Sequence, residues 1–568
     1  MTSAFKKYWA WIIVAALFAA YAPYIGIRYV RTLGDEKVYV SQALEMARDG
    51  RWFIQTLGDV PAYYKGPVHY VLVRLGVKVF GFTPWAVLYM NLLFAMAGAL
   101  ALGALIKRRL PEWEEGPVWG GVGFGLCVGI YAHTFASQME VELAGTAAVA
   151  LYLLDRLGPR DAGYLFWIVA GFAGWIKAPL HSAFLGVGAL IYWTLSGEIF
   201  ARLRNPKAWL AVLTGIVVGF AGYLPAALLD WQNFYERYLL AEIVNKASTW
   251  QTIWTPIVST YGFYLFPWLS LAVVAYVQGL WQLPRMIRES AARRLLLLSI
   301  SFSLPSLGFF IYHPFRLENY NLPFISGVFL LVGLIWSRRN RFFEWFYSLG
   351  FALTAALSIG FPVFISAMHV RFSPLPEWWP AWLLPVVWVG GIGGAYAFIR
   401  YGVREKGRRP GHLSLASVGL FWALGGFFSV VGEREMVDIR AYLKQADARG
   451  EKVTLSYYNL MGNIWNEWGL LNFWVDHPVQ GIHTEEKLRQ AIENGDTILL
   501  SAGEGHEDFK KFVQKTYPLR QFTYIPWKRW QTHGGADTGR PLWKDAWDRR
   551  DFTLLERNFY IVRTEPAT

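Results

Sequence analysis

The amino-acid sequence predicts a polytopic α-helical membrane protein that ends in a small α/β domain outside the membrane. Of the 568 residues, 54% are hydrophobic and only 17% are charged, and the mean hydropathy is +0.27. A soluble domain carries about 25% charged residues, so part of this chain avoids water. The 29 tryptophans fit the same class of protein, because indole rings gather at membrane–water interfaces.

Apolar runs along the chain predict about thirteen membrane-spanning helices, because a bilayer is crossed by about 20 mostly apolar residues. The predicted spans are Tyr8–Tyr29, Trp85–Ile106, Val118–Phe135, Val141–Leu154, Tyr164–Ile176, Ala178–Leu195, Trp209–Leu229, Ile257–Leu280, Leu295–Tyr312, Leu322–Trp336, Phe346–Met368, Trp379–Ile399 and Leu413–Val430. More spans follow the first run, so that run is interpreted as an uncleaved anchor rather than a signal peptide.

Basic residues fall in alternate connections between these runs. They are Lys6 and Lys7; Lys107, Arg108 and Arg109; Arg156 and Arg160; Arg202, Arg204 and Lys207; Arg285, Arg288, Arg293 and Arg294; Arg338, Arg339 and Arg341; and Arg404, Lys406, Arg408 and Arg409. Cytoplasmic loops are rich in Lys and Arg, so the alternation predicts a cytoplasmic N-terminus. An odd number of spans then places the C-terminal segment outside. Topology accounts for the net charge of +13, and no nucleic-acid partner is expected.

Two regions lie outside the predicted spans. The first outside loop, residues 31–84, contains a helical stretch, Asp35–Arg48, and a short apolar run, Val68–Phe80, which we expect to lie at the membrane interface. The second region, 433–568, is more polar and forms the predicted α/β domain, which follows a membrane domain of residues 1–432. Its expected strands are Lys452–Asn459, Thr497–Ser501 and Phe559–Thr564, and its expected helices are Met436–Ala448, Thr484–Asn494 and Glu507–Lys515.

The first outside loop places acids and a lysine close to the membrane. Gly34-Asp35-Glu36 follows the first span, and the loop continues through Tyr39 and Gly50-Arg51-Trp52 to Tyr63-Tyr64-Lys65-Gly66-Pro67. A carboxylate can accept a proton from a hydroxyl group, and a lysine can neutralise a departing phosphate. A solvated loop with a proline turn would give the same spacing, so both interpretations stay open on the residues alone.

The order of these motifs resembles the first periplasmic loop of the GT-C glycosyltransferases, a class that includes the lipid A aminoarabinose transferases and the protein O-mannosyltransferases. Those families usually have Lys-Pro-Pro where this chain has Lys65-Gly66-Pro67. The resemblance implies that Asp35 is the catalytic base, that Glu36 is a supporting acid and that Lys65 contacts the donor phosphate. It also implies a bacterial inner-membrane protein whose active site and C-terminal domain are periplasmic.

Later motifs extend the resemblance over most of residues 1–340. Ser137–Glu142 lies where the family often has a second acid, and Glu140 fits that position better than Glu142. Trp175-Ile176-Lys177-Ala178-Pro179 resembles the family's Thr-Lys-Gly-Pro turn, and the segment from Arg316 to Pro323 resembles a Lys-x-x-Tyr-x-Leu-Pro stretch. The implied roles are an acid for Glu140, phosphate ligands for Lys177 and Arg316, and lining of the donor or acceptor site for Tyr39, Tyr63, Tyr64, Glu142 and Tyr320.

Each later residue also has a simpler interpretation. Lys177 and Arg316 fit anchors at the membrane edge, and Glu140 and Glu142 fit acids in the first turn of a helix. The histidines near predicted outer ends are taken as interfacial residues without metal-ligand spacing, so the sequence gives no support for a metal site but leaves a divalent metal open as a cofactor. These histidines are His69, His133, His181, His313 and His369.

The expected function is inverting transfer of a sugar from a polyprenyl-phosphate donor to an envelope acceptor. Lipid A or another glycolipid is the preferred acceptor, because a C-terminal domain after the spans resembles the aminoarabinose transferases. A protein Ser/Thr acceptor is an alternative. A transporter of lipid-linked sugar without chemistry is another, although the sequence lacks the repeats of such folds and its charged candidates lie at the outer surface. The expected partners are the lipid-linked donor, the acceptor and membrane lipids.

Overall fold

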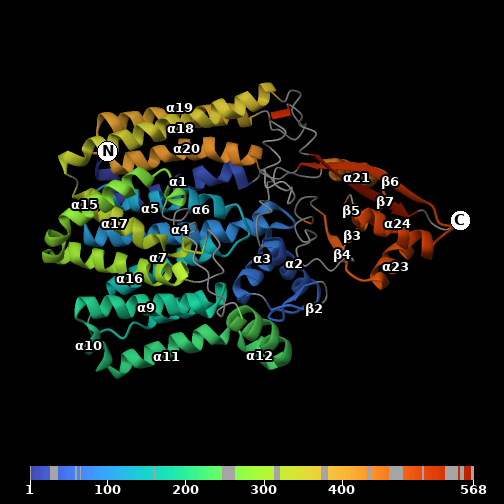
Figure 1. Ribbon diagram of the computed structural model, residues 1–568, viewed down its shortest axis with the longest axis horizontal. Coiled ribbons are helices and arrows are strands. Elements are labelled where there is room, and N and C mark those ends of the chain that lie inside the picture. The colour runs from blue at the N-terminus through green and yellow to red at the C-terminus, as the bar shows by residue number, and fades with distance from the viewer. Residues whose placement is uncertain are drawn as a thin grey trace.

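The computed structural model describes residues 2–25, 36–57, 60–63, 65–158, 160–245, 262–312, 320–338, 340–371, 382–431, 437–458, 472, 477–501, 504–530, 548–549 and 556–564. Long helices form a bundle, and strands of the C-terminal residues form a sheet beyond one end of it (Figure 1). Helices of the first outside loop lie between the bundle and this sheet.

The first half of the bundle consists of the first helix, which precedes the outer loop in the chain, and of the helices that follow the loop up to residue 245. Its elements are α1 (Thr2–Ile25), α4 (Pro84–Arg109), α5 (Gly116–Gly125), α6 (Val128–Thr134), α7 (Glu140–Arg156), α8 (Tyr164–Ile176), α9 (Pro179–Ser196), α10 (Ile199–Leu203), α11 (Pro206–Ala221), α12 (Leu224–Leu229), α13 (Trp231–Asn233) and the π-helix η1 (Phe234–Asn245). The outer loop itself contains α2 (Glu36–Arg48), the short strands β1 (Thr56–Leu57) and β2 (Val60–Pro61), and α3 (Pro67–Phe80).

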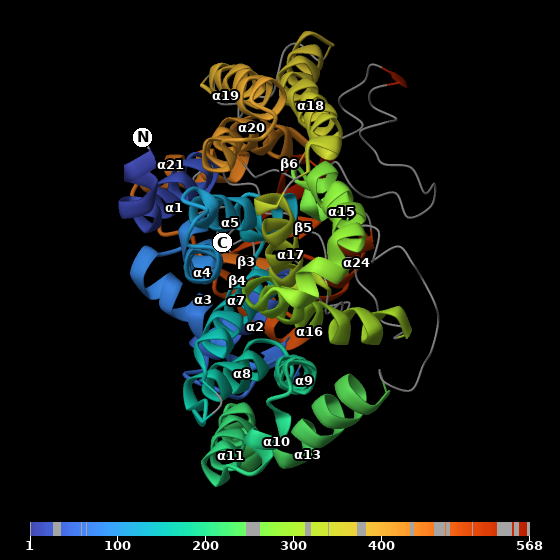
Figure 2. The same cartoon turned by 90° about the vertical axis from the view of Figure 1, so that its left-hand side faces the viewer.

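The second half of the bundle packs beside the first. It consists of η2 (Phe263–Leu265), α15 (Leu269–Arg288), α16 (Ser290–Tyr312), η3 (Leu322–Phe324), α17 (Ile325–Ser337), η4 (Arg341–Phe343), α18 (Glu344–Arg371), α19 (Leu383–Ala397), η5 (Phe398–Arg404) and α20 (Pro410–Val431). Seen from the end of the bundle, α5, α7 and α17 lie in the middle (Figure 2). Every residue of α5 is buried, as expected for a helix that is apolar on all sides.

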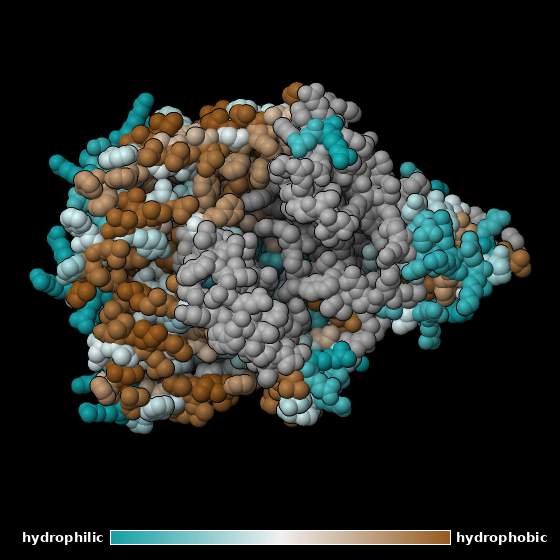
Figure 3. Space-filling view, in the orientation of Figure 1, coloured by the Kyte–Doolittle hydropathy of each residue, from teal (hydrophilic) through white to brown (hydrophobic). Residues whose placement is uncertain are grey.

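Four helical segments among the described residues are long and apolar enough to cross a bilayer: Phe5–Ile25, Pro84–Arg109, Arg341–Val370 and Leu383–Arg404. Shorter apolar helices cover Tyr164–Ile176, Pro206–Ala221 and Leu322–Ser337. Hydrophobic side chains cover the visible flank of the bundle, between hydrophilic residues at its two ends (Figure 3). The chain is therefore a helical membrane protein, and the figure of thirteen spans stays a prediction.

Three predicted spans are wrong as continuous helices, and one of them is Ile257–Leu280, whose described part is divided between η2 and α15. Val118–Phe135 is divided into α5 and α6, because the chain leaves helical geometry at Leu126 and Cys127. The backbone N–H of Val128 donates to the carbonyl oxygen of Phe266 (2.8 Å), which compensates for a missing helical bond. Trp209–Leu229 is likewise divided, at a turn between α11 and α12.

The other predicted spans overlap the observed helices with shifted ends. Part of the span Ile257–Leu280 lies outside the described residues, as does the start of Trp379–Ile399. The apolar run of the outer loop forms α3, which packs against α2 and α4. Its exposed face carries Leu75, Val79 and Phe80.

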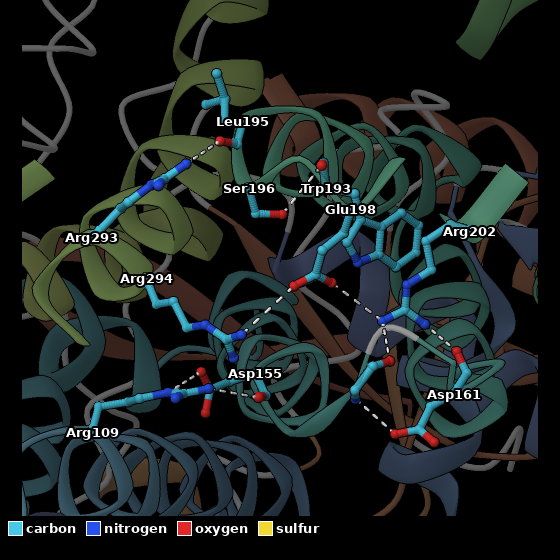
Figure 4. Close-up of polar contacts among 11 residues, drawn as sticks. Arg109, Asp155, Asp161, Trp193, Leu195, Ser196, Glu198, Arg202, Arg293 and Arg294 are labelled. Atoms are coloured by element: carbon cyan, nitrogen blue, oxygen red, sulfur yellow. Dashed lines mark hydrogen bonds and ion pairs between the residues drawn. The ribbon is translucent and has the colours of Figure 1, made fainter. Parts of the chain in front are cut away.

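The basic clusters meet at the end of the bundle away from the sheet. Arg109 at the end of α4 donates from Nε to Asp155 Oδ1 of α7 (2.6 Å). Arg202 of α10 and Arg294 of α16 approach the same carboxylate, Glu198, at 3.6 and 3.8 Å (Figure 4). The basic connections, which are every second connection along the chain, thus lie at the same end of the bundle, as the positive-inside rule requires.

The C-terminal residues form a mixed five-stranded sheet within the described part of the chain, in the order β4-β3-β5-β7-β6. The strands are β3 (Leu455–Tyr458), β4 (Val479–Ile482), β5 (Thr497–Ser501), β6 (Phe522–Trp530) and β7 (Glu556–Thr564), with helices α21 (Val437–Ala448), α23 (Glu485–Glu493) and α24 (Glu504–Thr516). β3 pairs in parallel with β4 and β5, and β7 pairs antiparallel with β5 and β6. The sequence patterns did not reveal β4 and β6.

The two faces of this sheet bury different sets of side chains. Ile498 and Leu500 of β5 join the core that α23 and α24 cover, whereas Leu499 between them joins the main core together with α21. Alternate residues of a strand point to opposite faces, so both faces of β5 are covered. His483, just after β4, lies 3.8 Å from the buried Glu45 of α2, which brings the sheet against the outer loop.

Close packing of α4 on α7 depends on glycine, which yields a testable prediction. An added Cβ at Gly145 would lie 2.2 Å from the carbonyl oxygen of Phe94. Small residues allow this approach of two helix backbones. We expect Gly145→Ala to lower the free energy of unfolding in detergent by about 1–3 kcal/mol, the usual cost of overpacking.

The matched control is Gly360→Ala in α18, because a Cβ there has no atom within 4 Å. Alanine is the better helix former, so this variant should unfold at or slightly above the wild-type temperature. Equal melting temperatures for the two variants would contradict the packing of α4 on α7.

Candidate functional site

The predicted site residues that the structure describes lie at the end of the bundle that faces the sheet. Glu36 begins α2, and Glu140 begins α7. Lys65 and Lys177 each precede, by two residues, a proline that opens a helix: Pro67 for α3 and Pro179 for α9. Proline suits the first helical position because its missing N–H would have no helical partner there.

The two lysine turns are packed against each other. The N–H of Gly66 donates to the carbonyl oxygen of Lys177 (3.0 Å). An added Cβ at Gly66 would lie only 1.9 Å from the carbonyl oxygen of Trp175. Proline, which the resemblance would place at this position, has no N–H to donate and has ring atoms that would collide with Trp175. The departure from the family's Lys-Pro-Pro therefore has a physical reason.

Gln55 holds the Lys65 turn from the other side. Its Nε2 donates to the carbonyl oxygen of Lys65 (2.6 Å), and its Oε1 accepts from the N–H of Lys65 (3.4 Å). The Lys65 residue is 9% exposed. Its turn is thus fixed by hydrogen bonds on both sides before any ligand binds.

Lys177 is paired with Glu140. The Nζ–Oε1 distance is 2.5 Å, and the two side chains are only 9% and 4% exposed. The ammonium group also lies 4.5 Å from the ring centroid of Tyr320, a favourable cation–π distance. His181 lies within electrostatic range of Lys65, Lys177 and Glu140, which places both lysines around one region. Each buried charge is compensated by its partner, as burial of an ion pair requires.

A second buried acid, Glu142, has a different partner. Its Oε1 lies 2.6 Å from Nδ1 of His69, and Nε2 of the same ring lies 3.1 Å from Oγ of Ser137. The backbone N–H of Ser137 donates to Oε1 of Glu36 (2.5 Å). His69 is 0% exposed, so its interpretation as an interfacial histidine is wrong. Sequence spacing could not reveal this cluster, because its members come from three separate segments.

The predicted lining tyrosines that the structure describes contact protein groups. Tyr39 meets the ring of His69 edge-on, with centroids 5.6 Å apart. Tyr63 donates from its hydroxyl to Oδ2 of Asp230 (3.0 Å). Burial raises the pKa of the Tyr63 phenol above its usual range, and the neighbouring Asp230 carboxylate raises that pKa further.

Three predicted site residues, Asp35, Tyr64 and Arg316, lie outside the described residues. Asp35 directly precedes Glu36, and Arg316 lies four positions before Tyr320 in the chain. Within the part of the chain that is described, His, Cys, Asp and Glu side chains form no group of three or more that could hold a metal ion. The roles of the site residues stay predictions.

The helical bundle and the terminal sheet together have the fold of a solved structure, ArnT. ArnT from Cupriavidus metallidurans bound to undecaprenyl phosphate is similar with a TM-score of 0.67 and 14% identity, over 98% of each chain. The apo form of that protein is similar with a TM-score of 0.62 and 13% identity, over 97% of each chain. No protein-family model and no curated protein sequence matches this chain. The likeness confirms, at the level of the fold, the resemblance that the sequence motifs indicated.

The contact between the lysine turns predicts that Gly66 cannot be replaced. We expect Gly66→Ala to lower the free energy of unfolding by about 1–3 kcal/mol through overpacking. Gly66→Pro should cost at least as much, since it also removes the hydrogen bond to Lys177. Thermal unfolding in detergent measures both effects, with Gly308→Ala as the control because a Cβ at Gly308 meets no atom within 4 Å. A Gly66→Pro variant as stable as wild type would show that the turns are not joined.

The buried pair Lys177–Glu140 predicts non-additive mutations. Lys177→Met strands a buried carboxylate and should cost about 3–5 kcal/mol of unfolding free energy. The double variant Glu140→Gln/Lys177→Met should recover much of this loss, because it leaves no unpaired charge. The control is Arg449→Met, which removes an exposed partner of Glu451 (2.8 Å; 49% and 44% exposed) and should cost at most about 1 kcal/mol. Additive losses in the double variant would refute the coupling.

Proposed function

We propose that this protein is an inverting glycosyltransferase that moves a sugar from a polyprenyl-phosphate donor to an acceptor hydroxyl of the cell envelope. One observation carries the proposal: two lysine turns, each at the N-terminal end of a helix, are joined at Gly66 and Lys177 and lie beside buried acids. Lysines and helix N-termini both favour a phosphate group. The fold adds support, because the similar ArnT structure contains undecaprenyl phosphate.

The proposed reaction is one displacement at the anomeric carbon. Asp35 takes the proton of the acceptor hydroxyl, whose oxygen forms the new bond to the anomeric carbon. The bond from that carbon to the phosphate oxygen breaks, and its electron pair leaves with polyprenyl phosphate. This anion needs no proton, since Lys65, Lys177 and Arg316 would stabilise its charge. A single displacement inverts the anomeric centre, whereas retention would need a carboxylate nucleophile.

The pair formed by Lys177 and Glu140 describes the proposed site before a donor binds. Glu140 keeps the ammonium group of Lys177 compensated inside the protein while no donor is bound. An arriving phosphate would supply a second anionic partner for Lys177. Glu36 supports the base indirectly, because it fixes the first turn of α2 through Ser137, directly after Asp35.

The acceptor in this proposal is lipid A or another envelope glycolipid. The terminal sheet supports this choice, because it lies over the outer loop, where His483 approaches Glu45. A covering domain of this kind suits an acceptor that remains partly in the membrane. We place the enzyme in the bacterial inner membrane, with a cytoplasmic N-terminus, a membrane domain of residues 1–432 and a periplasmic domain of residues 433–568. The arginine-rich end of the bundle supports this orientation, because cytoplasmic loops are rich in Lys and Arg.

The decisive experiment replaces Asp35 with asparagine and measures the mass of envelope glycolipids in cells that express the variant at the wild-type level. Asparagine keeps the size of the side chain but cannot act as a base. General base catalysis contributes about 10²–10⁴-fold, so a mass shift of one sugar should disappear. Asp49→Asn is the matched control. It changes another acid of the same loop, one that is paired with Arg48 (2.8 Å), and it should keep the shift.

Other outcomes identify other functions. A shift that persists in Asp35→Asn would refute Asp35 as the base. A wild-type protein that modifies Ser or Thr of a protein, and no glycolipid, would make it an O-mannosyltransferase-like enzyme. Purified protein that moves lipid-linked sugar across liposomes without consuming it would be a transporter.

A further inference from the structure

We propose that His69 and Glu142 are positioning residues that hold the catalytic segments of this site in register. The inference rests on the proposed function. Three hydrogen-bonded contacts carry it, from Glu142 to His69 (2.6 Å), from His69 to Ser137 (3.1 Å) and from Ser137 to Glu36 (2.5 Å). All four residues are buried, with at most 1% of their surface exposed.

Each residue in this chain of contacts lies within four positions in sequence of a proposed catalytic or phosphate-binding residue. Glu36 directly follows Asp35, and Glu142 lies two residues after Glu140 in the first turn of α7. His69 belongs to the first turn of α3, four residues after Lys65. The chain of contacts therefore ties together the segments that carry the proposed base, the proposed phosphate ligand and the second acid.

Segments far apart in sequence need such a link. His69 and Glu142 are separated by 73 positions, and Glu36 and Ser137 by 101. A misplacement of about 1 Å between a base and its substrate can cost about 10²-fold in rate. The contact of Lys177 with Gly66 fixes the lysine turns to each other, and Tyr70 of α3 donates to Gln42 of α2 (2.8 Å). The histidine adds a connection from α3 to the segment 137–142, because its two ring nitrogens contact Glu142 and Ser137, and Ser137 in turn donates to Glu36 of α2.

The order of side chains, Ser137, His69 and Glu142, is that of a nucleophilic triad, but the geometry excludes that role. A nucleophile must reach its substrate, whereas Ser137 is 0% exposed. Its hydroxyl contacts His69, and its backbone N–H donates to Glu36. The serine therefore connects His69 to Glu36 in the first turn of α2.

Stability alone does not account for these groups. Replacing both partners of a buried hydrogen bond with apolar groups of the same shape can be nearly neutral or stabilising. Oε2 of Glu142 also accepts no hydrogen bond from the described residues, which adds a desolvation cost. This polar cluster is costly to bury, and it connects three catalytic segments. Its role in fixing the relative positions of those segments explains its presence.

A second buried histidine–glutamate pair provides a matched control at the other end of the bundle. His412 of α20 lies 3.2 Å from Glu115, and both side chains are 9% exposed. Oε2 of Glu115 accepts from the N–H of Gly411 (2.9 Å), as Glu36 accepts from Ser137. Loss of His412 removes a close contact with a buried glutamate but no hydrogen bond of its Nδ1 with the described residues, whereas loss of His69 removes two hydrogen bonds near the proposed site.

The test compares His69→Phe, His69→Gln and His412→Phe in the purified full-length protein. Sugar transfer from a polyprenyl-phosphate donor gives kcat and KM, and hydrogen exchange reports on the first turn of α2. We expect His69→Phe to lower kcat about 10²-fold with little change in the donor KM and faster exchange at residues 36–40. His69→Gln, which keeps one hydrogen bond, should recover part of kcat. His412→Phe should keep the wild-type kcat even where it lowers the melting temperature.

The outcomes separate this inference from the proposed function. A wild-type protein that transfers no sugar refutes the proposed function. If wild type is active, a His69→Phe variant with the wild-type kcat overturns the positioning role, as do equal losses of kcat in His69→Phe and His412→Phe. Unchanged exchange at residues 36–40 overturns it whatever the activity. Should His69→Phe fail to fold, Glu142→Gln, which keeps the size of the side chain, replaces it with the same expected readouts.

Discussion

Charge buried in a membrane protein is stabilised only when an opposite charge or a hydrogen bond compensates for its lost hydration. That constraint organises both ends of this bundle. At one end, arginines of several helices share carboxylates such as Asp155 and Glu198. At the other end, Lys177 is paired with Glu140, and Glu142 with His69. Between the ends, apolar helices pack closely through glycines such as Gly145.

Both ends of the bundle contain paired charged and polar side chains, but the pairs differ in how exposed they are. The arginine end contains more exposed groups, such as Arg108 and Arg294 at 46% and 40%, and its pairs join helix termini. At the end that faces the sheet, the described pairs Lys177–Glu140 and His69–Glu142 are buried, with side chains at most 9% exposed. Full burial makes each of those pairs more sensitive to a single substitution. It also means that a phosphate arriving there would meet cations in surroundings of low dielectric constant, where electrostatic interactions are stronger than in water.

Much of the fold was predictable because hydrophobic runs and basic clusters are local patterns. The runs identified the helix Tyr164–Ile176, which matches α8, and the strand Thr497–Ser501, which matches β5. The errors arose where tertiary contacts override a local pattern. Val118–Phe135 is apolar throughout, yet the chain breaks at Leu126 and Cys127, where Val128 bonds instead to Phe266. Hydropathy cannot show such a break, because buried turns and buried helices are equally apolar.

The sequence by itself determined the class of protein, the end of the bundle that collects arginine, and the motifs that contain Asp35, Lys65 and Lys177. Each of these can be recognised from adjacent residues or from a pattern that repeats along the chain. Only the tertiary structure decided the partners: Glu140 with Lys177, Glu142 with His69, and Gly66 against Trp175. Those contacts join positions far apart in the chain. The identity of a partner across such a distance is set by the packing of whole helices, which no short motif encodes.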